Sequence, residues 1–578
     1  MNTEAGGLCD SVDIGAEEEK FPVVFFLLAL DHAAHFFEAV RAAGIFHAVG
    51  CDDKDGLLRD ILIPGVFVYI PDVVDRTDPV ARHGGDLQGI IARLDYVADL
   101  GCNALWINPC FDSPFKDAGY DVRDYKKVAP RYGTNEDLCR LFAEAHRRGV
   151  RVLLDLVPGH TSDQHPWFKA SARAEENEYS GRYIWTGSAF ESIEGKPYIS
   201  GMTDRDGAYM LNFFASQPSL NYGWLRRDKP WMSAPDSPEA LATREGMKDV
   251  MRFWLDLGCD GFRVDMADYL VKNDDESRSA TSAVWRDVRE MLDREYPEAA
   301  LVSEWSAPRL AINRAGFHMD FYLDHWHNGY NTLLRDYETE GGDHSYFRKD
   351  GGGDIRRFLR DYLPKYLETR DRGYISMITC NHDTPRPART LSPDELKLAY
   401  AFLLTMPGVP FLYYGDEIGM RYLDVPTKEG GYQRTGSRTP MQWDAGKNMG
   451  FSEAAEEQLY LPYDHSPDAP CVAEQEADPS SLLSVTKSLT ALRRRYEDLQ
   501  ADAEFAVIRA EADPPFVYRR GGLLLALNPS SKAVSWRSEL LKGRHTAYSI
   551  HEARVAGDGL TMGPQSFAVL EAGGAVSR

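Results

Sequence analysis

The sequence predicts an α/β protein built on a (β/α)₈ barrel of the TIM-barrel class. From about residue 61 onward, a unit repeats in which an amphipathic helix ends at a glycine and a short apolar strand follows. Helical periodicity, a glycine just past the helix and an uninterrupted apolar strand are typical of successive βα units with a parallel sheet. In addition, several of these strands end in a carboxylate, which is where a barrel of this class gathers its functional groups.

The repeat is clearest where predicted helices at 89–100, 138–148 and 247–257 each stop at a glycine before a strand. Enough units fit between residues 61 and 500 for eight strands, which we expect near 65–70, 104–107, 151–155, 262–265, 301–304, 318–323, 375–379 and 410–414. An open, doubly wound sheet also fits this repeat.

Two connections, near 158–223 and 415–479, are too long for ordinary loops. The first predicts a small domain inserted after the third strand. Beyond residue 500, short alternating apolar runs separated by turn residues predict a C-terminal antiparallel β-sandwich. The predicted domains are an N-terminal extension without an assigned role (1–60), the catalytic barrel (61–157 and 224–500), the inserted domain (158–223) and the C-terminal β domain (501–578).

Composition narrows the range of partners. The chain has 578 residues and a formal net charge of −24, which argues against nucleic acid because phosphate backbones are bound by an excess of Lys and Arg. The acidic first twenty residues have the wrong sign for an export signal, and the apolar run Pro22–Leu30 is shorter than the roughly 20 residues that span a bilayer. The eight cysteines form no CxxC pair. We therefore expect a cytoplasmic protein without a membrane partner.

Three carboxylates follow predicted strands, at Asp265, Glu304 and Asp383. A carboxylate at the end of a buried strand is costly unless it is paired or used. Each has a structural alternative, because Asp265 could form a salt bridge and Glu304 could cap a helix. Three such groups at one edge of a barrel nevertheless predict acid/base and nucleophilic chemistry on a sugar acetal.

Several motifs, taken together, resemble the α-amylase superfamily, glycoside hydrolase family 13, closest to its oligo-1,6-glucosidase and trehalose synthase-like branch. They occur in the family's order over nearly the whole chain after residue 61: Gly119–Asp121, Asp155–His160, Gln217–Asn221, Gly261–Asp265, the strand ending at Glu304, Asn381–Asp383 and Ser437–Trp443. Ser219 departs from the branch pattern, which usually has Asp there.

The resemblance implies catalytic roles for the three carboxylates. Asp265 is expected to be the nucleophile, Glu304 the acid/base residue, and Asp383 a third carboxylate that grips the distorted sugar. Arg263 precedes Asp265 by two residues and so faces the same side of the strand. We expect its guanidinium to orient Asp265 and to hold the pKa of that carboxyl low.

The resemblance also implies a glucose pocket. His160 and His382, beside Asp155 and Asp383, are expected to donate hydrogen bonds to the sugar. Tyr120 is expected to form the wall of the pocket and Asp121 its floor. Arg438 is expected to pair with Asp121 and to close the pocket after one sugar, although a surface ion pair is the plainer alternative for this arginine.

Two departures from the family pattern concern metals. Gly159 stands where many amylases place a calcium-ligating Asn, and the acidic loop after the first strand is replaced by 75–82, Asp-Arg-Thr-Asp-Pro-Val-Ala-Arg. Calcium needs several oxygen ligands, so we expect neither a structural calcium at these sites nor a cofactor. Met266, which follows Asp265, leaves the preferred linkage open.

The sequence thus predicts a retaining α-glucosidase that hydrolyses short α-glucosides, disaccharides or oligosaccharides, from the non-reducing end through a glucosyl–Asp265 intermediate. A transglucosylase or a trehalose synthase-like isomerase could use the same intermediate. A catalytically inactive barrel that acts as a binding subunit is a third hypothesis. The presence of all three carboxylates argues against an inactive barrel, because relatives of that kind have typically lost at least one of them.

Overall fold

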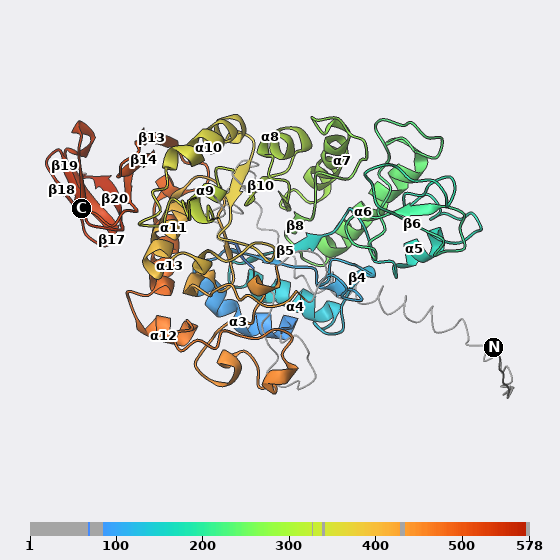
Figure 1. Ribbon diagram of the computed structural model, residues 1–578, viewed down its shortest axis with the longest axis horizontal. Helices are drawn as coiled ribbons and strands as arrows, with labels where there is room; N and C mark the ends of the chain where they lie inside the picture. The colour runs from blue at the N-terminus through green and yellow to red at the C-terminus, as the bar shows by residue number, and fades with distance from the viewer. Residues whose placement is uncertain (1–66, 70–84, 326–327, 338–340, 428–433, 574–578) are drawn as a thin grey trace, which may run out of the picture. The chain divides into compact units, whose positions relative to one another are not determined.

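The computed structural model describes residues 67–69, 85–325, 328–337, 341–427 and 434–573 (Figure 1). The predicted extension 1–60 and the loop 75–82 lie outside the described residues. Within the described part, no helix combines the length and the apolar character needed to cross a membrane.

Eight parallel strands form the central sheet, in the order β11-β10-β9-β8-β5-β2-β1-β12. A parallel bridge between Ile378 and Phe411 joins the two ends of this order, which closes the sheet into a barrel. The predicted barrel is confirmed, and each predicted strand matches one observed strand. Their bounds are β1 Phe67–Tyr69, β2 Ala104–Ile107, β5 Arg151–Leu156, β8 Gly261–Val264, β9 Ala300–Ser303, β10 Met319–Tyr322, β11 Tyr374–Met377 and β12 Phe411–Tyr413.

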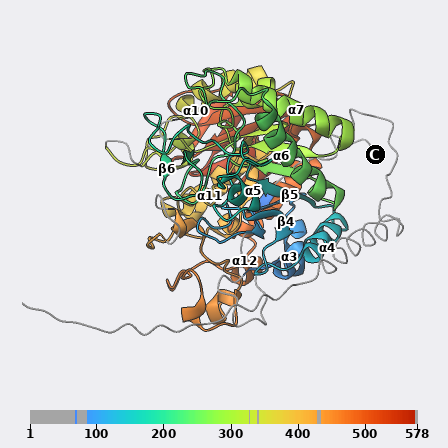
Figure 2. The same cartoon turned by 90° about the vertical axis from the view of Figure 1, so that its right-hand side faces the viewer.

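Helices lie between the strands, and several of them begin at a side-chain N-cap. The side chains of Asp86 and Ser237 accept backbone N–H groups at the starts of α3 and α6, and Thr134 and Ser392 form capping boxes at α4 and α11. In both views α3 and α4 lie side by side (Figures 1 and 2). The main helices are α3 Leu87–Asp99, α4 Asn135–His146, α6 Pro238–Asp256, α7 Ser279–Glu295, α8 Pro308–Leu310 with η1 Ala311–Ala315, α10 Ile355–Thr369, α11 Pro393–Thr405 and α13 Leu482–Arg495.

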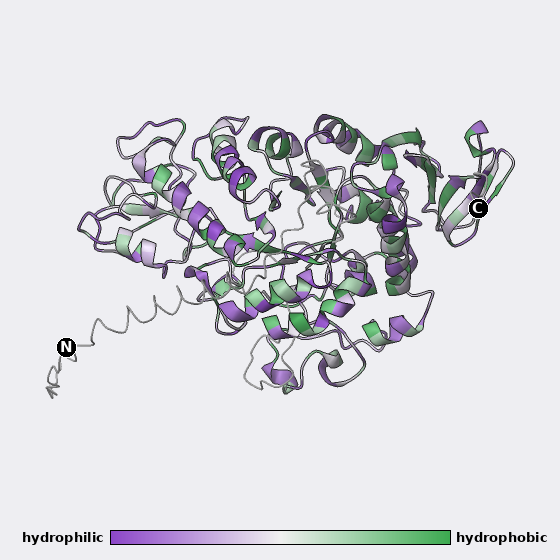
Figure 3. Cartoon of the chain, turned by 180° about the vertical axis from the view of Figure 1, so that it is seen from behind, coloured by the Kyte–Doolittle hydropathy of each residue, from purple (hydrophilic) through white to green (hydrophobic). Residues whose placement is uncertain are grey.

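Large apolar side chains fill the barrel interior. The ring of Phe321 on β10 lies 5.5 Å from that of Trp106 on β2 and 4.7 Å from that of Phe411 on β12. These strands lie apart in the sheet order, so their contact marks Phe321 as an inward-facing residue. Polar and apolar residues alternate along the surrounding helices, as expected for helices that cover a sheet with one face (Figure 3).

The first long connection contains the short helix α5 (Pro166–Ser171) and the two-stranded pair β6 (Tyr198–Ser200) and β7 (Ala208–Met210). It has a small apolar cluster of its own, formed by Ile184, Met210, Trp224 and Met232. The second connection is a series of short helical turns that ends in α12 (Val472–Ala477).

The C-terminal part forms two antiparallel sheets, in the orders β13-β14-β15-β20-β17 and β16-β19-β18. Leu524 and Ala526 of β15 pack with Leu560 and Met562 of β19, so the sheets share one core, and the predicted sandwich is confirmed. The bounds are β13 Phe505–Arg509, β14 Phe516–Arg520, β15 Leu523–Asn528, β16 Val534–Arg537, β17 Arg544–Ile550, β18 Ala553–Ala556, β19 Gly559–Met562 and β20 Ser566–Ala572.

Candidate active site

Polar side chains meet at the carboxyl ends of neighbouring barrel strands. In the strand register, Val264 of β8 pairs with Ser303 of β9, so Asp265 and Glu304 occupy the next position on each strand. Asp155 on β5 pairs in register with Arg263. Parallel strands end at one edge of the sheet, which is why residues far apart in the sequence arrive at one place.

The buried guanidinium of Arg263 connects three carboxylates. Its Nη1 lies 2.8 Å from Asp155 and 3.3 Å from Asp265, and its Nη2 lies 2.7 Å from Glu304. The planar, multidentate guanidinium suits this role because it donates in several directions at once. Asp265 and Glu304 therefore face the same centre.

Exposure separates the reactive groups from the supporting one. The side chains of Asp265, Glu304 and Asp383 keep 11%, 17% and 19% of their surface exposed, whereas that of Asp155 keeps none. The first three can therefore reach a substrate. Asp155 instead accepts hydrogen bonds from the Tyr120 hydroxyl at 2.9 Å and the Trp106 indole N–H at 3.1 Å.

The expected low pKa of Asp265 is wrong. Burial and the nearby charge of Glu304 raise the pKa of Asp265 well above its ordinary value, and Arg263 opposes this only in part. The main cause is burial. In addition, one cation serves three carboxylates, so its charge does not compensate the repulsion between Asp265 and Glu304. Burial likewise raises the pKa of Asp155 despite the same guanidinium.

Asp383 lies in a different electrostatic environment. Its carboxylate is 3.1 Å from His382 Nε2, 2.9 Å from Arg438 Nη2 and 3.0 Å from Arg434 Nη1. Burial acts to raise the pKa of Asp383, but the charges of His382, Arg438 and Arg434 together lower it well below its usual range. Asp383 is thus held as an anion.

The predicted aromatic wall and histidines lie beside these carboxylates. The Tyr120 ring stacks on His382 at 5.3 Å, with an interplanar angle of 13°. His160 is buried, with Nε2 3.1 Å from the Tyr120 carbonyl and Nδ1 3.0 Å from the Asn212 amide. Burial lowers the pKa of His160 to about 4, so this imidazole is neutral at pH 7.

The predicted pairing of Asp121 with Arg438 is wrong. The Asp121 carboxylate is fully buried and accepts the Ser113 hydroxyl at 3.0 Å and two backbone N–H groups, of Lys116 at 2.9 Å and Asp117 at 3.1 Å. It therefore folds the loop after β2 and does not form the pocket floor. Arg438 donates instead to the His382 carbonyl and to Asp383.

A different ion pair takes the expected place. Arg434 bonds Asp117, in the loop after β2, and also Asp383, which follows β11. Sequence reasoning missed Asp117, Arg434 and Trp106. One loop carries Asp117 and Asp121, and the other carries Arg434 and Arg438. The members of each pair are four residues apart, so spacing does not indicate which aspartate meets which arginine.

The residue after Asp265 also supports Glu304. Met266 has a positive φ of 42°, and its N–H donates to Glu304 Oε2 at 3.0 Å. The left-handed region is rare for a side chain of this size. This backbone conformation turns the Met266 N–H toward the acid/base candidate.

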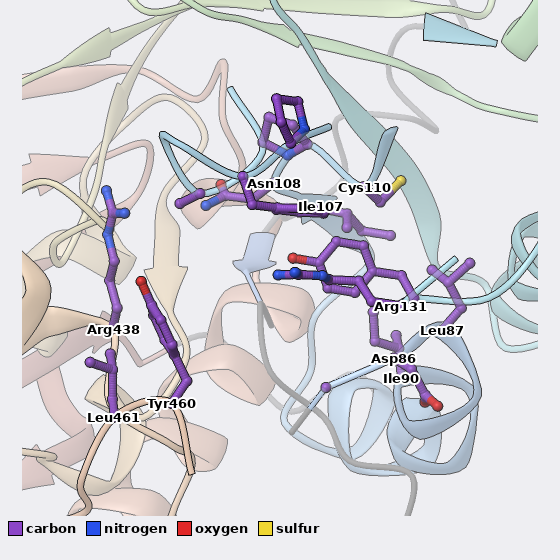
Figure 4. Close-up of a pocket in the computed structure, with 16 residues that line it drawn as sticks. Asp86, Leu87, Ile90, Ile107, Asn108, Cys110, Arg131, Arg438, Tyr460 and Leu461 are labelled. Atoms are coloured by element: carbon purple, nitrogen blue, oxygen red, sulfur yellow. The ribbon is translucent and has the colours of Figure 1, made fainter. Parts of the chain in front are cut away.

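A cavity of about 260 Å³ shares Arg438 with the site (Figure 4). Arg438, Tyr460 and Leu461 line one side, and Asn108 and Cys110 lie across from them. None of the three exposed carboxylates is among the described residues that line it. Arg438 thus lines the cavity and also contacts Asp383 of the site.

The described ranges contain no group of three His, Cys, Asp or Glu side chains that could hold a metal ion. The absence of calcium remains a prediction, since the loop 75–82 is outside those ranges. At Gly159, an added Cβ would lie 3.0 Å from the Asn212 amide nitrogen, which occupies the adjacent space.

In this barrel two partly accessible carboxylates contact one guanidinium, and a third contacts a histidine and two arginines. This is the architecture of an enzyme that processes glycosides. The family model "Alpha amylase, catalytic domain" matches residues 66–502. The chain belongs to the α-amylase family, glycoside hydrolase family 13.

Curated relatives come from the expected branch. The trehalose synthase/amylase TreS of Mycobacterium tuberculosis (strain CDC 1551 / Oshkosh) is 32% identical over 477 residues, which cover 72% of this chain and 73% of that protein. The oligo-1,6-glucosidase of Heyndrickxia coagulans is 28% identical over 528 residues, which cover 78% and 89%.

Solved structures agree on the fold. A mutant of MutB in complex with the substrate sucrose superposes with a TM-score of 0.71 at 24% identity, covering 88% of this chain and 99% of that chain. A second mutant, of the trehalulose synthase MutB, gives the same values.

Proposed function

We propose that this protein is a retaining α-glucosidase that releases glucose from the non-reducing end of short α-glucosides through a covalent glucosyl–Asp265 intermediate. The observation that carries the proposal is the convergence of Asp265 and Glu304 on Arg263, at 3.3 and 2.7 Å. The remaining expected residues, except Asp121, bind the sugar or support these two groups.

In the first step, an Asp265 oxygen attacks the anomeric carbon while the bond to the glycosidic oxygen breaks, and Glu304 gives that oxygen a proton. The aglycone leaves as an alcohol. In the second step, Glu304 takes a proton from water, whose oxygen attacks the anomeric carbon and displaces Asp265. Two displacements retain the α configuration.

The shared guanidinium suits this exchange of one proton. Burial and the charge of ionised Glu304 raise the pKa of Asp265, and a proton on Glu304 removes the second of these causes. Once Glu304 holds the proton, its repulsion disappears and Arg263 favours the Asp265 anion. This is the protonation state that the first step requires.

Asp383 supplies a fixed negative charge near the reacting ring. With the pKa held well below its ordinary value, its carboxylate stays ionised and accepts hydrogen bonds from sugar hydroxyls. An interaction that strengthens in the distorted, oxocarbenium-like ring lowers the barrier, whereas equal binding of the relaxed ring does not.

The ion pair of Asp117 with Arg434 supports action at a chain end. Arg434 joins the loop after β2 to Asp383, so this bridge crosses one side of the pocket. The stacked pair of Tyr120 and His382 forms an adjacent wall. A pocket closed in this way accepts one terminal glucosyl unit.

A second candidate is transfer of the glucosyl group to a sugar, as in a trehalose synthase-like isomerase. It is favoured by the identity of 32% to the mycobacterial TreS, against 28% to the oligo-1,6-glucosidase. The same carboxylates serve both reactions, and only the acceptor in the second step differs.

Products separate the two candidates. The enzyme is incubated with maltose, isomaltose, sucrose, trehalose and maltodextrins, and free glucose is compared with new disaccharides over time. The hydrolase predicts glucose as the main product with retained anomeric configuration. Mostly isomerised disaccharide overturns hydrolysis in favour of transfer, and inverted α-to-β product overturns both.

We place the enzyme in the cytoplasm, with sugars as its partners. All six cysteines of the described part are free thiols, which suits a reducing compartment. Fractionation of the source cells tests this assignment.

A further inference from the structure

Asp320, a buried carboxylate that faces away from the barrel interior, lies behind the acid/base candidate. Its neighbour Phe321 on β10 packs inside the barrel, so Asp320 points to the outer side because side chains alternate along a strand. It pairs in register with Ser303, the residue before Glu304. Ser303 is therefore on the outer side as well, and Glu304 faces inward.

One oxygen of Asp320 holds both ends of the turn that carries Glu304. Oδ1 accepts the Ser303 hydroxyl at 2.6 Å and the Ser306 N–H at 3.2 Å. Glu304 lies between these two residues. The outer layer of β10 thus fixes the backbone on either side of the acid/base candidate.

The turn needs such support because its conformation is unusual. Ser306 has a positive φ of 58°, a region that side-chain-bearing residues rarely adopt. The Leu323 N–H at the end of β10 donates to the Ser306 hydroxyl at 3.1 Å, which is a second attachment to the same strand.

Asp320 has no counter-ion among the described residues, although it is fully buried. Its Oδ2 has no hydrogen-bond partner there. Burial raises the pKa of Asp320 to about 7, against the hydrogen bonds from the Ser303 hydroxyl and the Ser306 N–H. A buried carboxylate of this kind is unfavourable for folding, so a role in holding the turn gives it a function.

We propose that Asp320 and Ser303 form a positioning pair that sets the carboxyl group of Glu304 for proton transfer to the leaving group. This inference rests on the proposed function, in which Glu304 is the acid/base residue. Neither Asp320 nor Ser303 touches the substrate. They act through the backbone of the turn.

Substrates with different leaving groups test the pair, because only a poor leaving group needs the proton. For each variant, kcat/KM is measured with maltose and with α-glucosyl fluoride, since kcat/KM reports the first, bond-breaking step. Fluoride departs without a proton from a carboxylic acid. A loss confined to maltose therefore indicates a misplaced acid.

Asp320→Ala is expected to lower kcat/KM for maltose about 10- to 100-fold, as for a small misplacement of a catalytic group, while the fluoride changes less than about 3-fold. Ser303→Ala is expected to show the same split with a smaller loss. Asp320→Asn keeps an acceptor oxygen for Ser303 and Ser306, so it is expected to restore most of the maltose activity.

Tyr322→Phe is the matched control. Tyr322 is on the outer side of the same strand, but its hydroxyl donates to Asp361 of α10 and not to the turn. Removal of this hydroxyl is expected to lower kcat/KM equally for both substrates or to leave it unchanged. Near-ultraviolet circular dichroism and thermal midpoints of all variants identify any that fail to fold.

Glu304→Gln is measured in parallel so that two failures can be told apart. If Glu304→Gln shows no difference between the substrates, the assignment of the acid/base residue is wrong. Suppose instead that Glu304→Gln lowers kcat/KM for maltose more than for the fluoride. If Asp320→Ala and Ser303→Ala then lower kcat/KM equally for both substrates, or change neither, the proposed positioning pair is wrong.

Discussion

The two sides of the site treat their carboxylates differently. On one side, Asp155, Asp265 and Glu304 share the single cation Arg263. On the other, Asp383 is bound by Arg434, Arg438 and His382, and Arg434 also pairs with Asp117. Three carboxylates thus share one arginine on the first side, whereas two arginines serve Asp383 and Asp117 on the second.

This difference divides the chemistry. Where cations are scarce, burial and repulsion raise the pKa of Asp265, and the pair with Glu304 can hold and pass a proton. Where cations are abundant, the pKa of Asp383 falls well below its ordinary value and the group keeps its charge. One side exchanges protons, and the other supplies a constant field.

The largest expected effect comes from removing the charge of the nucleophile. Asp265→Asn is expected to lower kcat on an aryl α-glucoside on the order of 10⁴-fold or more, because no covalent intermediate can form. Asp121→Asn is the control, because Asp121 is a buried carboxylate with no proposed catalytic role. This variant should lose far less turnover. Unchanged turnover in Asp265→Asn contradicts its role as nucleophile.

Asp383→Asn sharpens the comparison on the other side. It leaves Arg434 and Arg438 without their shared anion, and kcat is expected to fall about 10²- to 10³-fold. Because the pKa of Asp383 lies below its ordinary value, the group is ionised throughout pH 5–8 and does not titrate there. The acid limb of the kcat/KM profile should therefore keep its position, and a shift of that limb would show that Asp383 sets it.

The bridge between Asp117 and Arg434 gives a smaller effect. Arg434→Ala is expected to lower kcat/KM for maltose about 10- to 100-fold, mostly through KM, since a buried charge loses its partner. Asp117→Asn should act through the same bridge, so the double variant should lose less than the sum of the two losses.

Arg421→Ala is the control for this bridge, because Arg421 pairs with Asp464 and Asp468 outside the site. Additive losses in the double variant, or an equal loss in Arg421→Ala, count against the bridge as a wall of the pocket.

The smallest effect concerns Glu417, a carboxylate that is not among the partners of Arg263. Burial raises the pKa of Glu417 to about 7, although the Tyr96 hydroxyl donates to it at 2.7 Å. The folded protein binds this proton more tightly than the unfolded chain, whose Glu pKa is about 4.3. Its stabilisation is thus fully present below about pH 4 and is lost as the pH rises to 7.

Glu417→Gln keeps an acceptor for Tyr96 and removes the titration. Its Tm relative to the unsubstituted protein should be higher at pH 8 than at pH 5 by roughly 2 °C or more. Thermal unfolding at the two pH values measures the difference, and a difference independent of pH refutes the assigned proton.

Much of this architecture could be predicted. Apolar runs, helical periodicity and glycines after helices mark the eight strands, and parallel strands carry their C-terminal residues to one edge. Asp265 and Glu304 follow directly from this geometry, because each is the first residue after a strand.

The loops could not be predicted in the same way. Asp117 and Asp121 belong to one turn, and the backbone N–H groups that Asp121 accepts decide which carboxylate is free to reach Arg434. The sign of the pKa shift at Asp265 depends on how many carboxylates share Arg263. Which aspartate reaches Arg434, and whether the pKa of Asp265 rises or falls, both depend on distances between residues that are far apart in the sequence.

The most direct test of the central claim is to trap the intermediate. The enzyme is treated with 5-fluoro-α-glucosyl fluoride, which forms the covalent intermediate faster than water releases it, and the labelled peptide is sequenced by mass spectrometry. We predict one fluoroglucosyl group on Asp265. A label on Glu304 or Asp383, or turnover without any covalent adduct, would contradict the account.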